Sequence, residues 1–220
     1  KSNRRDFLKT SGQLLVGFSL FPLSNCQTKS SDELVDSCSG EPLKEVGDVN
    51  QIDSWVRIDS ENNLTVLTGK EELGQGIRIA LIQIAAEELD IHPDRCSIIN
   101  ADTGQTPNEG YTAGSNSVEG SGTAIRRAAA EARWFLLGLA EEKLGKSRNE
   151  LSVQEGIVSD SEGNKIAYGD LLRGKNLEVK ISGEAKPKNP ANHQYVGEPF
   201  HRPDILKLVK GEAHFIHDLR

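Results

Sequence analysis

The sequence predicts an α+β fold, and three observations carry this prediction. Two short apolar runs, residues 55–58 and 64–67, flank a polar Ser-Glu-Asn-Asn turn, which is typical of a β-hairpin. From residue 77 to residue 89, apolar residues recur three or four apart, which predicts one face of a helix that ends before Pro93. Strands and helices then interleave without a strict βαβ rhythm, so a mixed class follows.

The later elements are predicted by the same patterns. Residues 96–102, CSIINAD, begin as a short strand and open into a loop rich in Gly, Asn, Thr and Ser. Residues 118–144 predict a second helix, whose alanine-rich start would let a neighbouring backbone pack closely. Beyond it, residues 151–172 predict a strand, a turn at 162–164, a second strand and a short helix at 168–172.

Composition and charge limit the class of protein. The chain has 220 residues and a mass of 24.0 kDa. Of its residues, 36% are hydrophobic, which is enough to form the core of one sizeable domain or two small ones. The formal net charge is -7 and the pI is near 5.3. A general nucleic-acid binder needs a positive field to engage phosphates, so we do not expect a nucleic-acid partner.

The first 26 residues have the pattern of an export signal. Arg4 and Arg5 precede Phe-Leu-Lys and an apolar run at residues 14–23. A run of about ten residues is too short to span a bilayer, which takes about 20. The pattern resembles a twin-arginine signal, which exports folded proteins, so we expect a periplasmic protein. A basic N-terminus before a buried helix is the alternative.

The signal ends in a sequence that resembles a lipoprotein cleavage box, Leu-Ser-Asn-Cys, although Asn25 stands where Gly or Ala is usual. Lipid attachment at Cys26, and with it a membrane anchor, is therefore one of two open outcomes. Residues 27–50 are polar and weakly patterned, which predicts a flexible tether. The three cysteines, Cys26, Cys38 and Cys96, lack the spacing of an iron-sulfur or zinc site, so we expect no metal ligands in this chain.

Two loops rich in glycine carry the chemistry of the sequence. Each follows a predicted strand and precedes a predicted helix, so each can direct backbone N–H groups and a helix N-terminus at an anion. Gly74 and Gly76 permit close approach of a ligand to the main chain, and Gln75 offers both a donor and an acceptor. The second loop supplies hydroxyl and amide groups around a glycine, at Thr112, Gly114, Ser115, Asn116 and Ser117.

Plain turn and cap chemistry is the alternative for both loops. Glycine-rich turns between strand and helix often exist only to allow positive φ and to end or begin a helix. The first loop lacks the Gly-Lys-Ser/Thr of a Walker loop, and its Gly-Gln-Gly does not complete a GxGxxG dinucleotide fingerprint. Pattern alone therefore leaves the ligand-binding role open.

A family resemblance favours ligand binding. The segments TGKEELGQG, QIAAEELDI and DTGQTPNEGYTAGSNSVEGSGTAIRRAAAEAR resemble the molybdenum-cofactor-binding domain of the xanthine dehydrogenase and aldehyde oxidase family. Within that family they are similar to the large subunit of the isoquinoline 1-oxidoreductase and nicotinate dehydrogenase type. The segment YVGEPFHRPDILKLVKGEAHFIHDLR resembles the opening of that family's second domain, an α/β hammerhead.

The resemblance implies a cofactor and residues that hold it. The cofactor is a molybdenum ion on the dithiolene of a pyranopterin, usually as a cytosine dinucleotide in bacteria. By this resemblance Gly74, Gln75 and Gly76 line one side of the cofactor cleft, and Thr112, Gly114, Ser115 and Ser117 bind the pterin or pyrophosphate. Glu72 falls at a position that can face the substrate pocket; a solvated carboxylate at a helix N-terminus is its alternative.

Departures from the family pattern bear on activity. Lys70 stands where many relatives have a second glycine, and Ile79 where they commonly have threonine, so a polar contact to the cofactor is expected to be missing. The family's catalytic glutamate lies in a glycine-rich motif far along the large subunit, and no such motif occurs in this sequence. We therefore expect no catalytic residue in this chain and no turnover by it alone.

The predicted organisation is a signal at residues 1–26, a tether at 27–50, the cofactor domain at 51–184, a Pro-rich linker at 185–194 and the start of the hammerhead domain at 195–220. We expect the N-terminal portion of a molybdenum hydroxylase large subunit, truncated or split, that oxidises an N-heterocycle or an aldehyde. Its implied partners are the remainder of the large subunit, a small [2Fe-2S] subunit, and a cytochrome or quinone. The rival hypothesis is an exported, lipid-anchored binding or assembly module without cofactor.

Overall fold

The computed structural model describes residues 49–173, 177–202 and 205–212. The predicted signal, Cys26, nearly all of the predicted tether and residues 213–220 of the hammerhead segment lie outside the described residues. The first described element is a turn of 3-10 helix, Ile52–Ser54, and strand β1, Val56–Ile58, follows directly. The indole N–H of Trp55 donates to the carbonyl of Val49 at 2.9 Å, which fixes the entry of the chain.

The first sheet has three strands in the order β1-β2-β3. Strand β2, Leu64–Thr68, pairs antiparallel with β1 and confirms the predicted hairpin. Helix α2, Ile77–Leu89, then crosses over to β3, Cys96–Asn100, which pairs parallel with β2. A short 3-10 turn, Pro93–Arg95, separates α2 from β3, so the predicted end of the helix before Pro93 is confirmed.

The second predicted helix begins with a segment of different geometry. Residues Ser117–Gly122 form a π-helical segment, and α3, Thr123–Leu144, continues it as a regular α-helix. A Cβ atom on Gly122 would stand 2.9 Å from the end of the Ile84 side chain, so a larger residue here would require that side chain of α2 to move. The π-helical segment thus lies where the chain leaves the second glycine loop and packs on α2.

The second sheet differs from its prediction. Residues 152–167 form three strands, β4 Ser152–Gln154, β5 Ile157–Ser159 and β6 Lys165–Ala167, in antiparallel order. The apolar pattern predicts a single strand before the turn at 162–164, whereas the chain makes a further tight turn at Glu155 and Gly156. Both turn residues have positive φ, 53° and 68°, which is the backbone of a two-residue hairpin. Helix α4, Tyr168–Leu172, follows as predicted.

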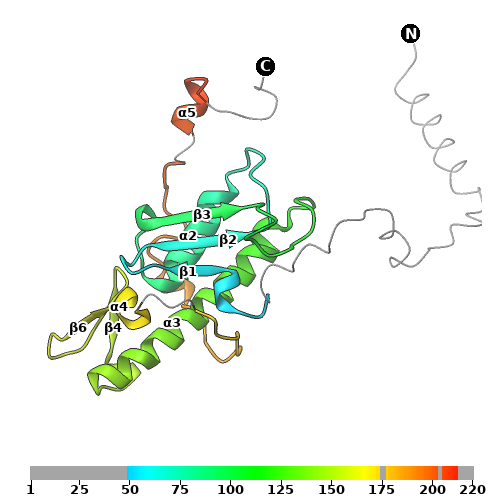
Figure 1. Cartoon of the computed structure of the whole chain (residues 1–220). Coiled ribbons are helices and arrows are strands. Elements are labelled where there is room, and N and C mark those ends of the chain that lie inside the picture. Colours follow the sequence, from blue (N-terminus) through cyan, green and yellow to red (C-terminus); the bar gives the residue numbers. More distant parts are fainter. Residues whose placement is uncertain (1–48, 174–176, 203–204, 213–220) are drawn as a thin grey trace, which may run out of the picture. The chain divides into compact units, whose positions relative to one another are not determined.

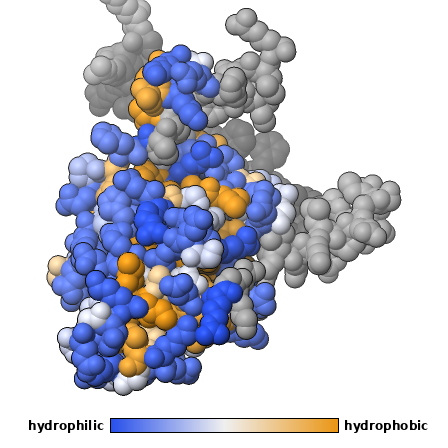
Figure 2. Space-filling model, turned by 60° about the vertical axis from the view of Figure 1, so that its left-hand side comes forward, coloured by the Kyte–Doolittle hydropathy of each residue, from blue (hydrophilic) through white to orange (hydrophobic). Residues whose placement is uncertain are grey.

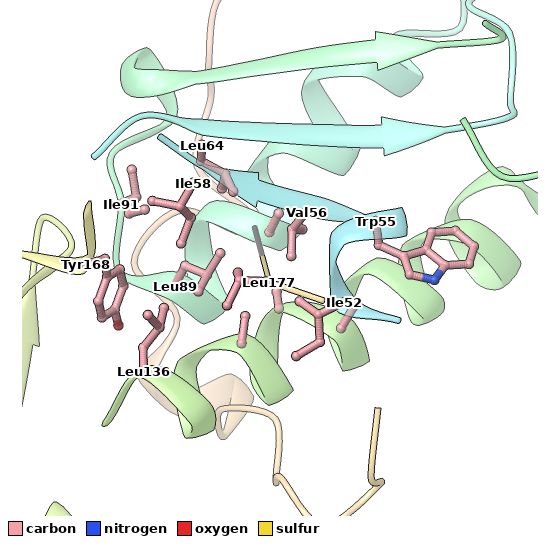
Figure 3. Close-up of a cluster of buried hydrophobic side chains, with 14 of the residues drawn as sticks. Ile52, Trp55, Val56, Ile58, Leu64, Leu89, Ile91, Leu136, Tyr168 and Leu177 are labelled. Carbon is pink, nitrogen blue, oxygen red and sulfur yellow. The ribbon is translucent and has the colours of Figure 1, made fainter. Parts of the chain in front are cut away.

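The hydrophobic core lies between the first sheet, α2 and α3. Figure 3 shows side chains from β1, β2, α2 and α3 converging, together with Tyr168 of α4 and Leu177. Val56, Leu64 and Leu89 are fully buried. Apolar burial of this kind contributes about 25 cal/mol per Å², so the core holds the sheet and both helices in one unit. Figure 2 shows that on one face the remaining hydrophobic residues form separate groups between hydrophilic ones.

The last described elements are short. Residues 188–202 contain a 3-10 turn, Pro190–Asn192, and bind along α2; helix α5, Ile205–Val209, follows them. Helix α5 exposes Ile205, Leu206 and Val209. No helix within the described ranges is long and apolar enough to cross a membrane. The domain boundary placed at residues 185–194 stays a prediction.

Candidate functional site

The parallel pairing of β2 and β3 brings the two glycine loops to one edge of the sheet. Thr68 pairs with Asn100 at the ends of these strands, and the N–H of Ala101 donates to the Thr68 carbonyl at 2.9 Å. Parallel strands end on the same side, so the loop after β2, residues 69–76, starts beside the loop after β3, residues 101–116. Figure 1 shows both loops leaving the arrowhead end of the sheet.

The first loop is closed by the carboxylate of Glu72. Its Oε1 atom accepts from the N–H of Gly74 at 2.8 Å and of Gly76 at 2.9 Å, and its Oε2 atom accepts from the N–H of Arg78 at 3.2 Å. The glycine-rich pattern predicts that these N–H groups are directed at a ligand anion. That expectation is wrong for Gly74 and Gly76, because a carboxylate four residues or fewer away reaches back and caps α2.

The electrostatics of Glu72 agree with this cap. Partial burial raises the pKa of the Glu72 carboxyl, but the hydrogen bonds from Gly76, Arg78 and Gly74 and the charge of Arg202 outweigh it and lower the pKa below its usual value of 4.5. The carboxylate form is therefore the one the loop stabilises. Gln75 also folds inward: its Oε1 accepts from the N–H of Leu73 at 2.5 Å, and its Nε2 donates to the Glu71 carbonyl at 2.9 Å.

The second loop presents its backbone differently. Gly114 and Ser115 both have left-handed backbones, with φ of 65° and 58°. Such a conformation is uncommon for serine and is found most often where the chain has a functional or turn constraint. Within the described ranges, the N–H groups of Gly114 and Ser115 have no protein acceptor, and a Cβ atom on Gly114 would meet nothing within 4 Å. This part of the site is open to a ligand.

The two loops are fastened to each other. The N–H of Glu71 donates to the Thr112 hydroxyl at 2.8 Å, which joins a first-loop residue to a second-loop residue of the predicted site. Glu109 contributes a second tie, because its Oε2 accepts from the Thr68 hydroxyl at 2.6 Å and from the Gly69 N–H at 2.7 Å. Its Oε1 accepts from the hydroxyl of Ser121. One carboxylate thus joins β2, the second loop and the π-helical segment.

Lys70, which departs from the family pattern, also joins the two loops by hydrogen bonds. Its side chain is buried, and its ammonium donates to the carbonyls of Glu109 at 2.7 Å and Tyr111 at 2.9 Å. The sequence reasoning also gave no role to Glu109. Nothing in the sequence around Lys70 or Glu109 marks them as partners, because their contact depends on the parallel register of β2 and β3.

Apolar side chains flank both loops and face solvent. Leu73 is 69% exposed, Tyr111 is 95% exposed and Val118 is 53% exposed. A separate hollow of about 220 Å³ lies between α2, the π-helical segment and residues 193–196. The predicted loop residues are not part of its lining, which includes Ile84, Val118 and His193. Among the described residues, no group of three or more His, Cys, Asp or Glu side chains is placed to hold a metal ion.

Comparisons with known proteins identify the family of the chain. The model of the molybdopterin cofactor-binding domain family matches residues 35–203. A nicotinate dehydrogenase subunit from Pseudomonas putida is 34% identical over 166 residues, which are 76% of this chain and 14% of that protein. The beta subunit of isoquinoline 1-oxidoreductase from Brevundimonas diminuta is 27% identical over 224 residues, which are 96% of this chain and 27% of that protein.

A solved structure of quinoline 2-oxidoreductase from Pseudomonas putida 86 matches with a TM-score of 0.46 and 26% identity, over 53% of this chain and 15% of that chain. The chain thus spans between 14% and 27% of the length of the two curated relatives above. The family match extends over most of the chain and contains both glycine loops. The chain therefore belongs to the molybdopterin cofactor-binding domain family, of the xanthine dehydrogenase and aldehyde oxidase type.

Proposed function

We propose that this chain is the N-terminal portion of a molybdenum hydroxylase large subunit and contributes one wall of its cofactor site. The observation that carries the proposal is the junction of the two glycine loops at one sheet edge, where the Glu71 N–H meets the Thr112 hydroxyl at 2.8 Å. The reaction is oxidative hydroxylation of an N-heterocycle or an aldehyde, with oxygen from water. The names of three relatives support an N-heterocycle, and that of a fourth, an aldehyde oxidase, supports an aldehyde.

The proposed cofactor is a pyranopterin in its cytosine dinucleotide form, and the described residues offer hydrogen-bond donors for its pterin or pyrophosphate. Among the described residues, the backbone N–H groups of Gly114 and Ser115 have no protein acceptor. The hydroxyls of Thr112 and Ser115 lie in the same loop, and Ser117 follows as the first residue of the π-helical segment. Such donors suit a pyrophosphate or a pterin edge. When bound, the molybdenum centre supplies the two-electron oxidation and the transfer of oxygen.

The first loop has a supporting role in this proposal. Gly74 and Gly76 have positive φ, 99° and 78°, and a Cβ atom on Gly74 would meet nothing within 4 Å, so a ligand can approach the main chain there. Glu72 holds that backbone in place from within. Gln75 can exchange its internal hydrogen bonds for a ligand edge. A direct contact of Glu72 with substrate remains a prediction for the assembled enzyme.

The proposed partner chains are inferred from the exposed apolar side chains beside the loops and from the greater length of the relatives. Leu73, Tyr111 and Val118 form exposed apolar positions beside the loops, which suit burial under the remainder of the large subunit, on the same or another chain. Electrons leave through a small [2Fe-2S] subunit to a cytochrome or quinone. The twin-arginine pattern supports a periplasmic location, and Cys26 is the proposed lipid attachment site.

One purification tests this proposal. The protein is isolated with its natural complex from the cell envelope, and molybdenum, iron, released cytidine monophosphate and intact masses are measured by mass spectrometry. We expect molybdenum and cytidine monophosphate in equal amounts, in a complex much heavier than 24.0 kDa that also contains iron. A solitary chain without molybdenum would contradict the proposal and favour an assembly module. The mass of the N-terminal peptide reports whether Cys26 carries lipid.

A further inference from the structure

Residues 188–202, which we call the strap, bind along α2 in the direction opposite to that of the helix. At the C-terminal end of α2, the ammonium of Lys188 pairs with the Asp90 carboxylate. The backbone N–H of Lys188 donates to the Glu88 carboxylate at 2.8 Å. Farther back along the helix, the amide of Gln83 donates to the carbonyls of Tyr195 at 2.7 Å and Glu198 at 2.9 Å. The strap, orange in Figure 1, thereby returns the chain toward the first glycine loop.

Glu87 is the main anchor of the strap. Its Oε2 atom accepts three successive backbone N–H groups, from Gln194 at 2.8 Å, Tyr195 at 2.7 Å and Val196 at 3.1 Å. The Glu87 side chain is 2% exposed. Burial raises its pKa, but these hydrogen bonds outweigh it and, with the charge of Lys188, lower the pKa below its usual value of 4.5. A buried carboxylate with three N–H donors holds its partner segment in one register.

Aromatic packing fixes the part of the strap between Glu87 and the loop. The rings of His92, Tyr195 and Phe200 meet edge to face, with centroids 5.6 to 6.3 Å apart. The Tyr195 hydroxyl donates to Glu155 at 3.2 Å. Edge-to-face pairs are favourable beyond the burial of their area, so this cluster limits how far residue 200 can move.

The strap ends with Arg202 on the first glycine loop. The guanidinium Nη1 donates to the Gly74 carbonyl at 3.0 Å, and the Arg202 side chain is the neighbour nearest to a Cβ atom built on Gly76, at 3.7 Å. The positive charge of Arg202 also contributes to the lowered pKa of Glu72. The loop is therefore held from two sides, by the Glu72 carboxylate inside and by the Arg202 guanidinium outside.

We propose that Arg202 is a positioning residue for the first glycine loop and that the strap, anchored by Glu87, sets its place. Arg202 binds the Gly74 carbonyl and its charge stabilises the Glu72 carboxylate, so the backbone of residues 72–76 is ordered before any ligand arrives. Pre-ordering of this kind lowers the entropy cost of binding. The inference rests on the proposed function of this loop in holding the pyranopterin, and it extends that function to a residue more than 100 positions away in the sequence.

Hydrogen exchange of the complete polypeptide tests the inference without any cofactor. The reporters are the N–H groups of Gly74, Gly76 and Arg78, all bound to Glu72, and the reference is the N–H of Leu67 within the sheet. We expect Arg202→Gln to raise exchange at the reporters at least about tenfold, with Leu67 unchanged. Arg202→Lys should restore part of the protection, because an ammonium still places a donor and a positive charge there.

Two further variants sharpen the test. Arg95→Gln is the matched control, because Arg95 also donates to a loop carbonyl, that of Glu61, on another loop of the same sheet. It should leave the reporters unchanged. Glu87→Gln removes the charge that holds the strap, so it should raise exchange at residues 194–196 and also at Gly74 and Gly76.

Each outcome bears on a separate claim. Unchanged reporters in Arg202→Gln, or a rise that extends equally to Leu67, would overturn the positioning role. Faster exchange of the strap in Glu87→Gln with an unchanged loop would overturn the coupling of strap and loop. A local rise in Arg202→Gln together with full molybdenum content in the assembled complex would leave Arg202 as the positioning residue and count against the loop's role in holding the cofactor.

Discussion

Gly69 and Pro107 touch so closely that a Cβ atom on Gly69 would stand 2.3 Å from the Pro107 carbonyl oxygen. This contact sets the distance between the two glycine loops. Gly69→Ala must push the second loop away, because a carbonyl oxygen of the backbone cannot move aside as a side chain can. We expect a loss of about 1–3 kcal/mol in the free energy of unfolding, measured by urea denaturation.

Gly104→Ala is the control for Gly69→Ala. A Cβ atom on Gly104 would meet only the side-chain oxygen of Asp102, at 3.2 Å, and a small shift of that side chain relieves the contact. We expect the free energy of unfolding to change by less than about 1 kcal/mol. Both Gly→Ala changes lower the conformational entropy of the unfolded chain alike, so a difference between them comes from the folded state. Equal losses for the two variants would show that the Gly69 contact does not set the loop distance.

Lys70→Met tests the tie between the loops. Methionine keeps an unbranched apolar stem but removes the ammonium that binds the carbonyls of Glu109 and Tyr111. We expect the free energy of unfolding to fall by about 1–3 kcal/mol, because these partly buried carbonyls lose a charged donor. Thermal or urea denaturation measures the change.

Lys143→Met is the matched control for Lys70→Met. Lys143 donates to the Asp170 carbonyl at 3.3 Å on an exposed part of α3. A single exposed bond contributes little, so we expect a change within about 0.5 kcal/mol. Should the two variants lose the same amount, Lys70 would be one more surface lysine and the loops would be held by other contacts.

The caps at Glu72 and Glu87 predict how stability depends on pH. Hydrogen bonds and nearby positive charges outweigh burial and lower the pKa of both carboxyls in the folded state below 4.5. Their contribution is complete above the pKa of the unfolded chain and is lost as the pH falls through the folded pKa. The advantage of wild type over Glu72→Gln or Glu87→Gln should shrink as the pH falls from about 7 to about 3.

Urea denaturation at both ends of this range measures that difference. Glu142→Gln, an exposed carboxylate on α3, is the control and should stay within about 0.5 kcal/mol of wild type throughout. An advantage over the Glu72 or Glu87 variants that persists undiminished in acid would rule out the charged cap as its source.

Local pattern was sufficient to predict much of the fold. The hairpin of β1 and β2, helix α2 with its end before Pro93, strand β3 and helix α4 all follow from periodicity and turn residues. These signals involve neighbours in the sequence. The glycines within residues 74–76 and 112–117 likewise indicated both loops of the candidate site, because glycine is the residue preferred where φ is positive.

Contacts between segments distant in the sequence could not be predicted from local pattern. The parallel register of β2 and β3, which places the loops side by side, depends on the whole crossover through α2. Lys70, Glu109 and Arg202 acquire their roles only from that arrangement. The turn at Glu155 and Gly156 does have a local signal, its glycine, but the apolar residues on both sides also fit one continuous strand.

The central claim is that the first glycine loop helps to hold the molybdenum cofactor, and Gly76→Val tests it most directly. Gly145→Val is its control, because Gly76 has φ 78° and ψ 25° and Gly145 has φ 66° and ψ 25°, each at a helix end. The backbone strain is therefore alike, and only the place differs.

The measurement is molybdenum per polypeptide in the purified complex, by mass spectrometry. We expect a loss of at least about tenfold in Gly76→Val and a content near wild type in Gly145→Val, which corresponds to at least about 1.4 kcal/mol of binding. Equal molybdenum in the two variants would contradict the role of this loop in the cofactor site.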